Sequence, residues 1–308
     1  MRVADLFAGA GGFSTGAQKA GLDVVFAANH WPIAVAVHER NHPRTVHACQ
    51  DLQQFDFATV PDHEILVASP ACPGHSDAGR PGRANSAKVA STHDVMRSTA
   101  WAVVSCAEAK RPPALIVENV PGFLKWDLFP AWRMALELLG YHLTEQILTA
   151  SRWGVPQRRK RLFLVGRLDG PLPITDPVAD EPAIRGALDF RSGDWGHIDE
   201  VTRPGSRARL EHARSHFRRC WGQHVSHRGA WGRSLDEPSS TVTTQNQHWL
   251  VDGDRYRLWT VAETLRAMTF APNYIPDTVG RTNALTLAGN AVPPKLAQGL
   301  LERVAASL

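Results

Sequence analysis

The chain has 308 residues, of which 43% are hydrophobic and 21% charged, a composition that fits one large domain with a smaller companion. No run of about 18 apolar residues occurs, which excludes an apolar transmembrane helix, and the first residues lack the long apolar stretch of a secretion signal. A cytoplasmic protein with no membrane partner is therefore expected. The net charge is only +4, but the isoelectric point near 9 is compatible with a polyanionic partner.

The first half of the chain alternates short apolar runs with helical patterns. This order is typical of an α/β fold with a doubly wound, mostly parallel sheet. Because ligands of such sheets bind beyond the carboxyl ends of the strands, Gly9, Cys72 and Glu118 are expected to share one site. The predicted strands are residues 2–7, 24–28, 65–68, 114–117 and 161–166, and the predicted helices are residues 12–20, 33–41, 96–110 and 128–139.

The character of the chain changes near Asp169, where four prolines punctuate a polar stretch that leads into a segment rich in Arg, His, Gly and Trp. We therefore expect a small domain at residues 168–259. The large domain would consist of residues 1–167 together with 260–308. Helices are predicted at residues 261–268 and 294–306, and the last helix is expected to pack back on the large domain.

Residues 77–92 are rich in Gly, Ser, Arg and Ala and contain almost no large apolar residue. A segment of this kind in a compact domain is either disordered or an active-site lid. Its place directly after Cys72 favours a lid that closes over bound nucleic acid, with Arg80 and Arg83 as contacts.

Arginine dominates residues 203–233, which contain no lysine and a single acidic residue, Glu211. The planar guanidinium group suits phosphates and guanine edges, although a solvated basic face is the simpler alternative. The candidates for DNA contact are Arg214, Arg218, Arg228 and Arg233.

A second pattern in the same region is the recurrence of His212, His216, Cys220 and His224 at every fourth residue, with His227 close behind. On a helix these side chains would form one stripe, a pattern that zinc sites also show. The interleaved arginines and the lack of a second ligand cluster favour a polar helix that faces DNA, and no metal site is expected.

The four cysteines are far apart and should be reduced thiols. Three of them, Cys49, Cys106 and Cys220, are interpreted as small buried hydrophobic residues. The fourth, Cys72, is surrounded by Pro70, Pro73 and Gly74, which hold the backbone in a fixed turn after a strand. This setting makes Cys72 a candidate nucleophile.

The loop after the first predicted strand contains Gly9, Gly11 and Gly12, which allow a tight turn and a close approach to a ligand. By itself the loop indicates a nucleotide-like cofactor such as NAD, FAD or S-adenosylmethionine, or a tight turn without a ligand. Its spacing is not the Gly-x-Gly-x-x-Gly of dinucleotide-binding proteins.

Five short patches occur in one particular order along almost the whole chain: Asp5-Leu-Phe-Ala-Gly-Ala-Gly-Gly12, Ser69-Pro-Ala-Cys-Pro-Gly-His-Ser76, Glu118-Asn-Val120, Gln157-Arg-Arg-Lys-Arg161 and Gly289-Asn-Ala-Val-Pro-Pro294. In this order they resemble the DNA (cytosine-5) methyltransferases. The resemblance implies a Rossmann-like methyltransferase fold with a small target-recognition domain. It also implies methyl transfer from S-adenosylmethionine to carbon 5 of a cytosine flipped out of duplex DNA, through a covalent adduct of Cys72 at carbon 6.

The resemblance also assigns cofactor contacts. Trp31 would stack on the adenine, and Asp51 would accept a hydrogen bond from its amino group. Where the family has a ribose-binding acid, this chain has His30, whose neutral imidazole can still accept one hydrogen bond. The full set is Phe7, Ala8, Gly9, Ala10, Gly11, Gly12, His30, Trp31, Asp51, Leu52, Pro70, Asn290, Ala291 and Val292.

The catalytic residues implied are Cys72, Glu118, Arg159 and Arg161. Glu118 would bind N3 and the exocyclic amine of cytosine, Arg161 would hold O2, and Arg159 would help position Cys72 or Glu118. Strand alternation is expected to point Arg159 and Arg161 to one side, and a role in phosphate binding is the alternative for the whole cluster. Thr243, a further DNA-binding candidate, lies in a Thr-Val-Thr-Thr stretch that resembles the element organising the recognition domain.

Two other functions stay open. The same chemistry on tRNA is one, since that branch of the family shares these motifs. The other is a catalytically silent regulator that binds cofactor and DNA, which the altered neighbours Ala71 and Pro73 keep possible although Cys72, Glu118 and Arg161 are intact. The leading expectation is a monomeric enzyme acting on double-stranded DNA in the cytoplasm, encoded by a bacterium or a phage.

Overall fold

The computed structural model describes residues 1–71, 99–223, 232–245 and 248–308. These residues form two compact units, which are described separately. The first unit contains residues 1–149, 160–177 and 294–308, and the second contains residues 150–159 and 178–293. The helices of residues 260–293 therefore group with the second unit, whereas the predicted boundaries assign them to the large domain. The reason is that α7 (Val261–Ala267) contacts α8 (Arg281–Asn290) and the 3-10 helix η6 (Ile184–Ala187) of the same unit.

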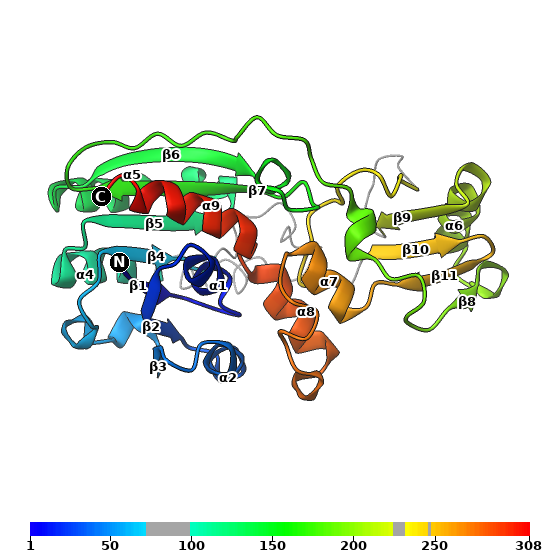
Figure 1. Ribbon diagram of the computed structural model, residues 1–308, viewed down its shortest axis with the longest axis horizontal. Helices are drawn as coiled ribbons and strands as arrows, with labels where there is room; N and C mark the ends of the chain where they lie inside the picture. The colour runs from blue at the N-terminus through cyan, green and yellow to red at the C-terminus, as the bar shows by residue number, and fades with distance from the viewer. Residues whose placement is uncertain (72–98, 224–231, 246–247) are drawn as a thin grey trace. The chain divides into compact units, whose positions relative to one another are not determined.

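The first unit is built on a seven-stranded sheet with the order β3-β2-β1-β4-β5-β7-β6 (Figure 1). The strands β1 to β5 run parallel, whereas β7 is antiparallel to both β5 and β6. This confirms the predicted α/β fold with a mostly parallel sheet. The strands are β1 (Arg2–Leu6), β2 (Asp23–Asn29), β3 (Val46–Cys49), β4 (Ile65–Ala68), β5 (Ala114–Asn119), β6 (His142–Thr149) and β7 (Lys160–Arg167).

Helices of the first unit cover both faces of this sheet. Side chains of α4 and α5 join the core cluster that contains Ala4 and Leu6 of β1, while Asp5 between them bonds to Ser14 of α1 on the other face. The bounds are α1 (Gly12–Lys19), α2 (Pro32–Asn41), α4 (Trp101–Lys110), α5 (Phe129–Leu138) and α9 (Pro294–Ala305), with short 3-10 helices η1 (Leu52–Gln54), η2 (Phe57–Thr59) and η4 (Pro121–Lys125).

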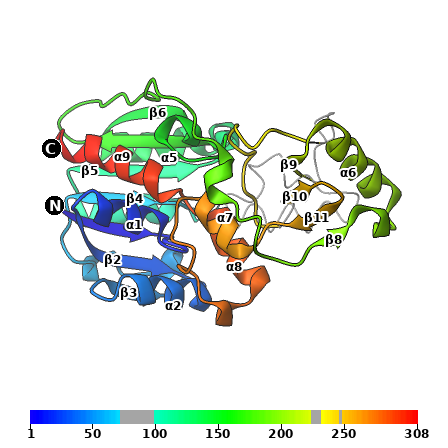
Figure 2. The same ribbon diagram turned by 45° about the vertical axis from the view of Figure 1, so that its right-hand side comes forward.

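The C-terminal helix α9 packs on α1 of the first unit (Figure 2), whereas the sequence predicted only that it packs on the large domain. Gly16 allows the two helices to approach closely. A Cβ atom at this position would lie 2.6 Å from Ala297 Cβ and 2.7 Å from the Gln298 backbone nitrogen. The helix α9 from the end of the sequence thus completes, with α1, the layer that covers β1.

The second unit contains a four-stranded antiparallel sheet with the order β8-β11-β10-β9, and α6 packs against β9 and β10 (Figure 2). Its strands are β8 (Gly196–His197), β9 (Arg219–Gln223), β10 (His248–Asp252) and β11 (Arg255–Leu258). Its helices are α6 (Pro204–His216), α7 (Val261–Ala267) and α8 (Arg281–Asn290), with 3-10 helices η5 (Ala150–Trp153), η6 (Ile184–Ala187), η7 (Ile198–Glu200) and η8 (Asp277–Val279).

The predicted stripe of histidines and cysteine on one helix is wrong. The helix α6 ends at His216, and Cys220 lies on β9. Cys220 is fully buried with Leu210 and Trp249, and this burial raises the pKa of its thiol to about 12. His224 and His227 lie outside the described residues. Within the described part of the chain, no three His, Cys, Asp or Glu side chains are grouped to hold a metal ion.

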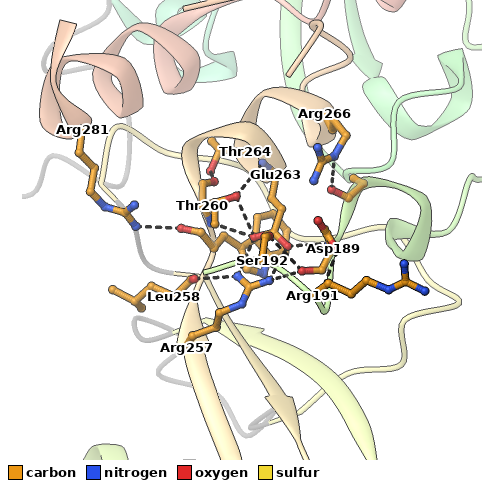
Figure 3. Close-up of polar contacts among 12 residues, drawn as sticks. Asp189, Arg191, Ser192, Arg257, Leu258, Thr260, Glu263, Thr264, Arg266 and Arg281 are labelled. Carbon is orange, nitrogen blue, oxygen red and sulfur yellow. Dashed lines mark hydrogen bonds and ion pairs between the residues drawn. The ribbon is translucent and has the colours of Figure 1, made fainter. Parts of the chain in front are cut away.

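A buried ion pair joins the small sheet to the helix that follows it. Arg257 of β11 and Glu263 of α7 face each other (Figure 3), with 2.7 Å between Arg257 Nη1 and Glu263 Oε2 and between Arg257 Nη2 and Glu263 Oε1. Glu263 also accepts hydrogen bonds from the backbone N–H groups of Thr260 and Asp189. This network connects the end of β11, the start of α7 and the segment around residue 189.

No helix in the described parts of the chain is long and apolar enough to cross a membrane.

Buried histidines in the first unit predict that acid destabilises it. Burial, and next the neighbouring histidines, lower the pKa of His38 to about 2 and that of His42 to about 4, from a usual 6.5. Both imidazoles take up protons on unfolding, so stability is lost as the pH falls below about 6.5. Burial raises the pKa of Asp5 from 3.8 to about 7, which opposes this loss over the same window. Two imidazoles outweigh one carboxyl group.

We therefore expect the free energy of unfolding to be lower at about pH 5 than at about pH 7.5, with a net slope of up to about 1.4 kcal/mol per pH unit. Urea unfolding at the two pH values measures it. His42→Asn should reduce the slope, whereas His142→Gln, at an exposed position, should not. Equal stability of the unaltered protein at both pH values would contradict the prediction.

Candidate active site

The predicted cofactor segments of the first unit follow the carboxyl ends of neighbouring parallel strands. Register pairs Leu6 of β1 with Ala28 of β2 and Ala68 of β4, and pairs Ala68 with Val117 of β5. The ends of these strands therefore lie at one edge of the sheet. Residues 7–12, 30–31, 51–52 and 70 follow the ends of these strands and of β3, and Glu118 lies at the end of β5.

The glycine-rich loop at this edge has an unusual backbone. Phe7, Gly9 and Gly11 have positive φ angles of 59°, 55° and 87°, and a positive φ is rare for a residue with a side chain. The turn is closed by a hydrogen bond from Gly11 N–H to the Ala8 carbonyl, 2.8 Å long. Strained backbone of this kind is often found at ligand-binding sites.

The first turn of α1 is held by Asp5 rather than by its own N-cap residue. Gly11 is the N-cap and has no side chain to accept a hydrogen bond. The Oδ2 atom of Asp5 instead accepts from the backbone N–H of Ser14 at 3.2 Å and from its hydroxyl at 2.7 Å. This satisfies one of the N–H groups that a helix start leaves unpaired.

The neighbouring segments present an aromatic ring and polar groups. Trp31 is half-buried and donates its backbone N–H to Asn29 Oδ1 at 2.9 Å, and His30 beside it is exposed. Asp51 is exposed and accepts a hydrogen bond from Gln53 N–H at 3.0 Å, while Leu52 is buried.

Glu118 and Arg161 form an ion pair between adjacent strands. Glu118 lies at the end of β5 and Arg161 at the start of β7, with Arg161 Nε 3.2 Å from Glu118 Oε1. The side chains are only 8% and 18% exposed, respectively. The guanidinium group thus orients the carboxylate in a site with little solvent. The motifs predict that these two residues share one site, but local sequence does not predict that they pair.

Asn119 at this edge has a role that the sequence did not predict. It is buried, donates from Nδ2 to the carbonyl of Pro70 at 3.1 Å, and accepts from Val120 N–H at 2.9 Å. Asn119 therefore fixes the chain two residues before Cys72. Its place beside Glu118 in the Glu-Asn-Val patch is the signal from which this role could have been read.

Four of the predicted residues lie outside the described residues: Cys72, Arg80, Arg83 and Arg228.

The structure separates Arg159 from the strand that carries Arg161. Because β7 begins at Lys160, the expected strand alternation does not extend to Arg159. In the second unit, its buried guanidinium group donates to the carbonyls of Val242 and Gly289, both at 2.9 Å. Arg158 is paired with Glu181 and Glu237 of the same unit, at 3.0 and 3.4 Å.

The Gly-Asn patch ends α8 in the second unit, where Ala291 and Val292 are buried and Asn290 is exposed. A Cβ atom on Gly289 would lie 2.4 Å from the carbonyl carbon of Thr243 and from the nitrogen of Thr244. Only glycine fits so close to a neighbouring backbone. The Thr243 hydroxyl donates to the Gln245 carbonyl at 3.1 Å.

The remaining DNA-contact candidates have different surroundings. Arg214 of α6 is paired with Asp254 at 2.9 Å and with Asp199 at 3.3 Å. Arg218 is exposed. Arg233 is also exposed, and its guanidinium carbon lies 5.9 Å from the ring centre of Trp221.

Comparison with protein families gives a match over residues 1–182, more than half of the chain, to the model described as C-5 cytosine-specific DNA methylase. Among curated proteins, the type II methyltransferase M.MthTI of Methanothermobacter thermautotrophicus is 25% identical over 99% of this chain and 97% of its own length. The type II methyltransferase M.NlaX of Neisseria lactamica is 32% identical over 61% of this chain and 60% of its own length.

Solved structures share the fold of the whole chain. The Dnmt2 methyltransferase of S. pombe aligns with a TM-score of 0.71 and 20% identity, over all of this chain and 98% of that one. The Entamoeba histolytica methyltransferase EhMeth aligns with a TM-score of 0.71 and 16% identity, over the same shares of the two chains.

Proposed function

Because the chain belongs to the C-5 cytosine-specific DNA methylase family, whose members use S-adenosylmethionine, we propose that it methylates carbon 5 of a cytosine flipped out of duplex DNA. The observation that carries this proposal is the pairing of Glu118 with Arg161 beside the carboxyl edge. The type II relatives support a role in a restriction-modification system. We further propose that the enzyme is a cytoplasmic monomer.

The residues at the sheet edge fit S-adenosylmethionine. The turn of residues 7–12 brings backbone close to a ligand, the half-buried ring of Trp31 suits an adenine face, and the exposed Asp51 carboxylate suits an amino group. His30 would accept a hydrogen bond from the ribose, and the Gly-Asn motif makes Asn290 a further proposed cofactor contact. The bound cofactor would supply the methyl group as an electrophile.

Cys72 is the proposed nucleophile. Its thiolate adds to carbon 6 of the cytosine, and the electron pair of the 5,6 double bond moves towards carbon 5. This covalent step makes carbon 5 reactive enough to take a methyl group, since covalent catalysis divides one difficult step into easier ones. After the methyl transfer, a water molecule is proposed as the base that takes the proton from carbon 5. The electron pair of that C–H bond re-forms the 5,6 double bond and expels the thiolate.

Glu118 and Arg161 would bind the cytosine ring during this addition. The Glu118 carboxyl group is proposed to hydrogen-bond N3 and the exocyclic amine, and Arg161 to bind O2. Their ion pair holds both side chains in place before the base arrives, and preorganised polar groups stabilise charge that develops in a transition state. Asn119 would hold the chain that precedes Cys72 through the Pro70 carbonyl.

Arg159 is proposed as a positioning residue, since its partners are two backbone carbonyls within the second unit. The arginine-rich second unit is proposed to bind duplex DNA and to select the target. Flipping a base costs a few kcal/mol, which contacts to the DNA backbone would offset. Arg218 and Arg233 are the exposed candidates among its described residues.

Covalent trapping tests this function. Long duplex DNA of mixed sequence in which 5-fluorocytosine replaces cytosine should form a stable adduct with the protein when S-adenosylmethionine is present. Fluorine cannot leave carbon 5 as a proton does, so the thiolate is not expelled. A denaturing gel and intact mass detect the adduct, and ordinary duplex DNA is the control. The absence of any adduct would overturn the proposal. An adduct that forms only with tRNA containing 5-fluorocytosine would show that the substrate is RNA rather than DNA.

A further inference from the structure

A hydrogen-bonded chain of buried side chains lies behind the cofactor-binding edge of the first unit. Building on the proposed function, we propose that His38 is a positioning residue for S-adenosylmethionine, because it links Ser14 of α1 to His47 of β3. The imidazole would thereby hold three elements that carry cofactor-binding segments in one arrangement.

The geometry of this chain is continuous. His38 Nε2 lies 2.9 Å from Ser14 Oγ, and His38 Nδ1 lies 2.8 Å from His47 Nε2. Ser14 Oγ continues to Asp5 Oδ2 at 2.7 Å. Asp5, Ser14 and His38 are buried, and His47 is half-buried. Both imidazole nitrogens of His38 are therefore used, one towards each neighbouring element.

Each member of the chain stands close in sequence to a proposed cofactor segment. Asp5 and Ser14 flank the strained loop of residues 7–12. His38 is on α2, which begins directly after Trp31, and His47 is on β3, which ends two residues before Asp51. Backbone hydrogen bonds also join these segments, from Ala8 N–H to the Ala28 carbonyl at 3.0 Å and from Gln50 N–H to the Asn29 carbonyl at 3.2 Å, so the buried side chains add a second connection behind the edge of the sheet.

The direction of the hydrogen bonds follows from proton counting. An ionised Asp5 can only accept, so the Ser14 hydroxyl donates to it and must accept from the N–H at His38 Nε2. This leaves His38 Nδ1 as an acceptor, and the N–H at His47 Nε2 donates to it. His38 is neutral, since burial and its histidine neighbours lower its pKa to about 2. Loss of one member leaves buried polar groups without partners, which is costly.

Two substitutions at His38 test the hydrogen bond to Ser14 and the hydrogen bond to His47 separately. A glutamine places its amide nitrogen near the position of Nε2 and can still donate to Ser14. An asparagine reaches only the position of Nδ1 and loses that link. His38→Asn and Ser14→Ala are expected to raise the Kd for S-adenosylhomocysteine about three- to tenfold, the usual effect of one hydrogen bond. His38→Gln keeps the link to Ser14 but loses the one to His47; because His47 is half-buried and water can pair with its N–H, the Kd should rise less, by about two- to threefold.

Isothermal titration calorimetry at about pH 8, where Asp5 is ionised, measures these affinities. Steady-state kinetics should show the same rise in KM for S-adenosylmethionine, with kcat and the KM for DNA unchanged. The matched control is His63→Gln, which alters another buried histidine of the first unit, bonded only locally to the Pro61 carbonyl. Its Kd should not change.

The outcomes are distinguishable. Failure of the unaltered protein to bind S-adenosylmethionine or S-adenosylhomocysteine overturns the proposed function itself. Folded His38→Asn and Ser14→Ala variants that bind as tightly as the unaltered protein overturn the role of His38 alone. An equal loss in His63→Gln also overturns it, because the effect would then be general destabilisation. Should His38→Asn not fold, Ser14→Ala decides, since it removes a single oxygen atom.

Discussion

Replacing Cys72 with serine is expected to lower the rate of methyl transfer by a factor of about a thousand or more. The thiolate is the species that adds to carbon 6, and a serine hydroxyl is not ionised near neutral pH and is a weaker nucleophile. The substitution changes one atom, so binding of duplex DNA should remain close to that of the unaltered protein. Transfer of a radiolabelled methyl group measures the rate, and a gel-shift assay measures the binding.

Cys49→Ser is the matched control for this experiment. Cys49 is a free cysteine at the end of β3, and it is exposed, so its interpretation as a buried residue is wrong: the edge strand β3 leaves it open to solvent. Its replacement should leave methyl transfer unchanged. Near-normal activity of Cys72→Ser would show that Cys72 is not the nucleophile. A loss of DNA binding equal to the loss of activity would show that Cys72 acts through structure rather than through a covalent bond.

The second large effect is expected at Glu263, where alanine should lower the free energy of unfolding of the second unit by about 3 to 5 kcal/mol. The substitution leaves the Arg257 guanidinium group without its carboxylate in a site where the two side chains are only 2% and 0% exposed. It also removes the acceptor for the Thr260 and Asp189 backbone N–H groups (Figure 3). Urea unfolding followed by tryptophan fluorescence measures the change.

Glu211→Ala provides the comparison, since it breaks the solvent-exposed pair of Arg207 with Glu211 within α6. This change should cost less than about 1 kcal/mol. The double variant Arg257→Met with Glu263→Met should be more stable than Glu263→Ala alone, because it leaves no unpaired buried charge. If the Glu263 and Glu211 variants were equally stable, the buried network would not hold the sheet to α7.

Local patterns in the sequence predicted much of the first unit. The apolar runs that form β1, β2, β4, β5 and β7 are found within one or two residues of their predicted bounds. The half-exposed β3 and the alternating β6 were missed, since neither is a continuous buried run. The four strands of the second unit were also missed, because they have only two to five residues each and contain arginine, histidine or glycine rather than a continuous apolar run.

In the candidate site, too, some features were predictable from the sequence and others were not. The sequence alone determined which residue types stand at the strand ends, because a glycine turn, an acid after an apolar strand and an ordered set of motifs are local features. Only the tertiary structure decided that Arg161 pairs with Glu118, that Asn119 holds Pro70, and that His38 connects Ser14 to His47. These partners are separated by many residues in the chain, and the packing of strands and helices brings them within hydrogen-bonding distance.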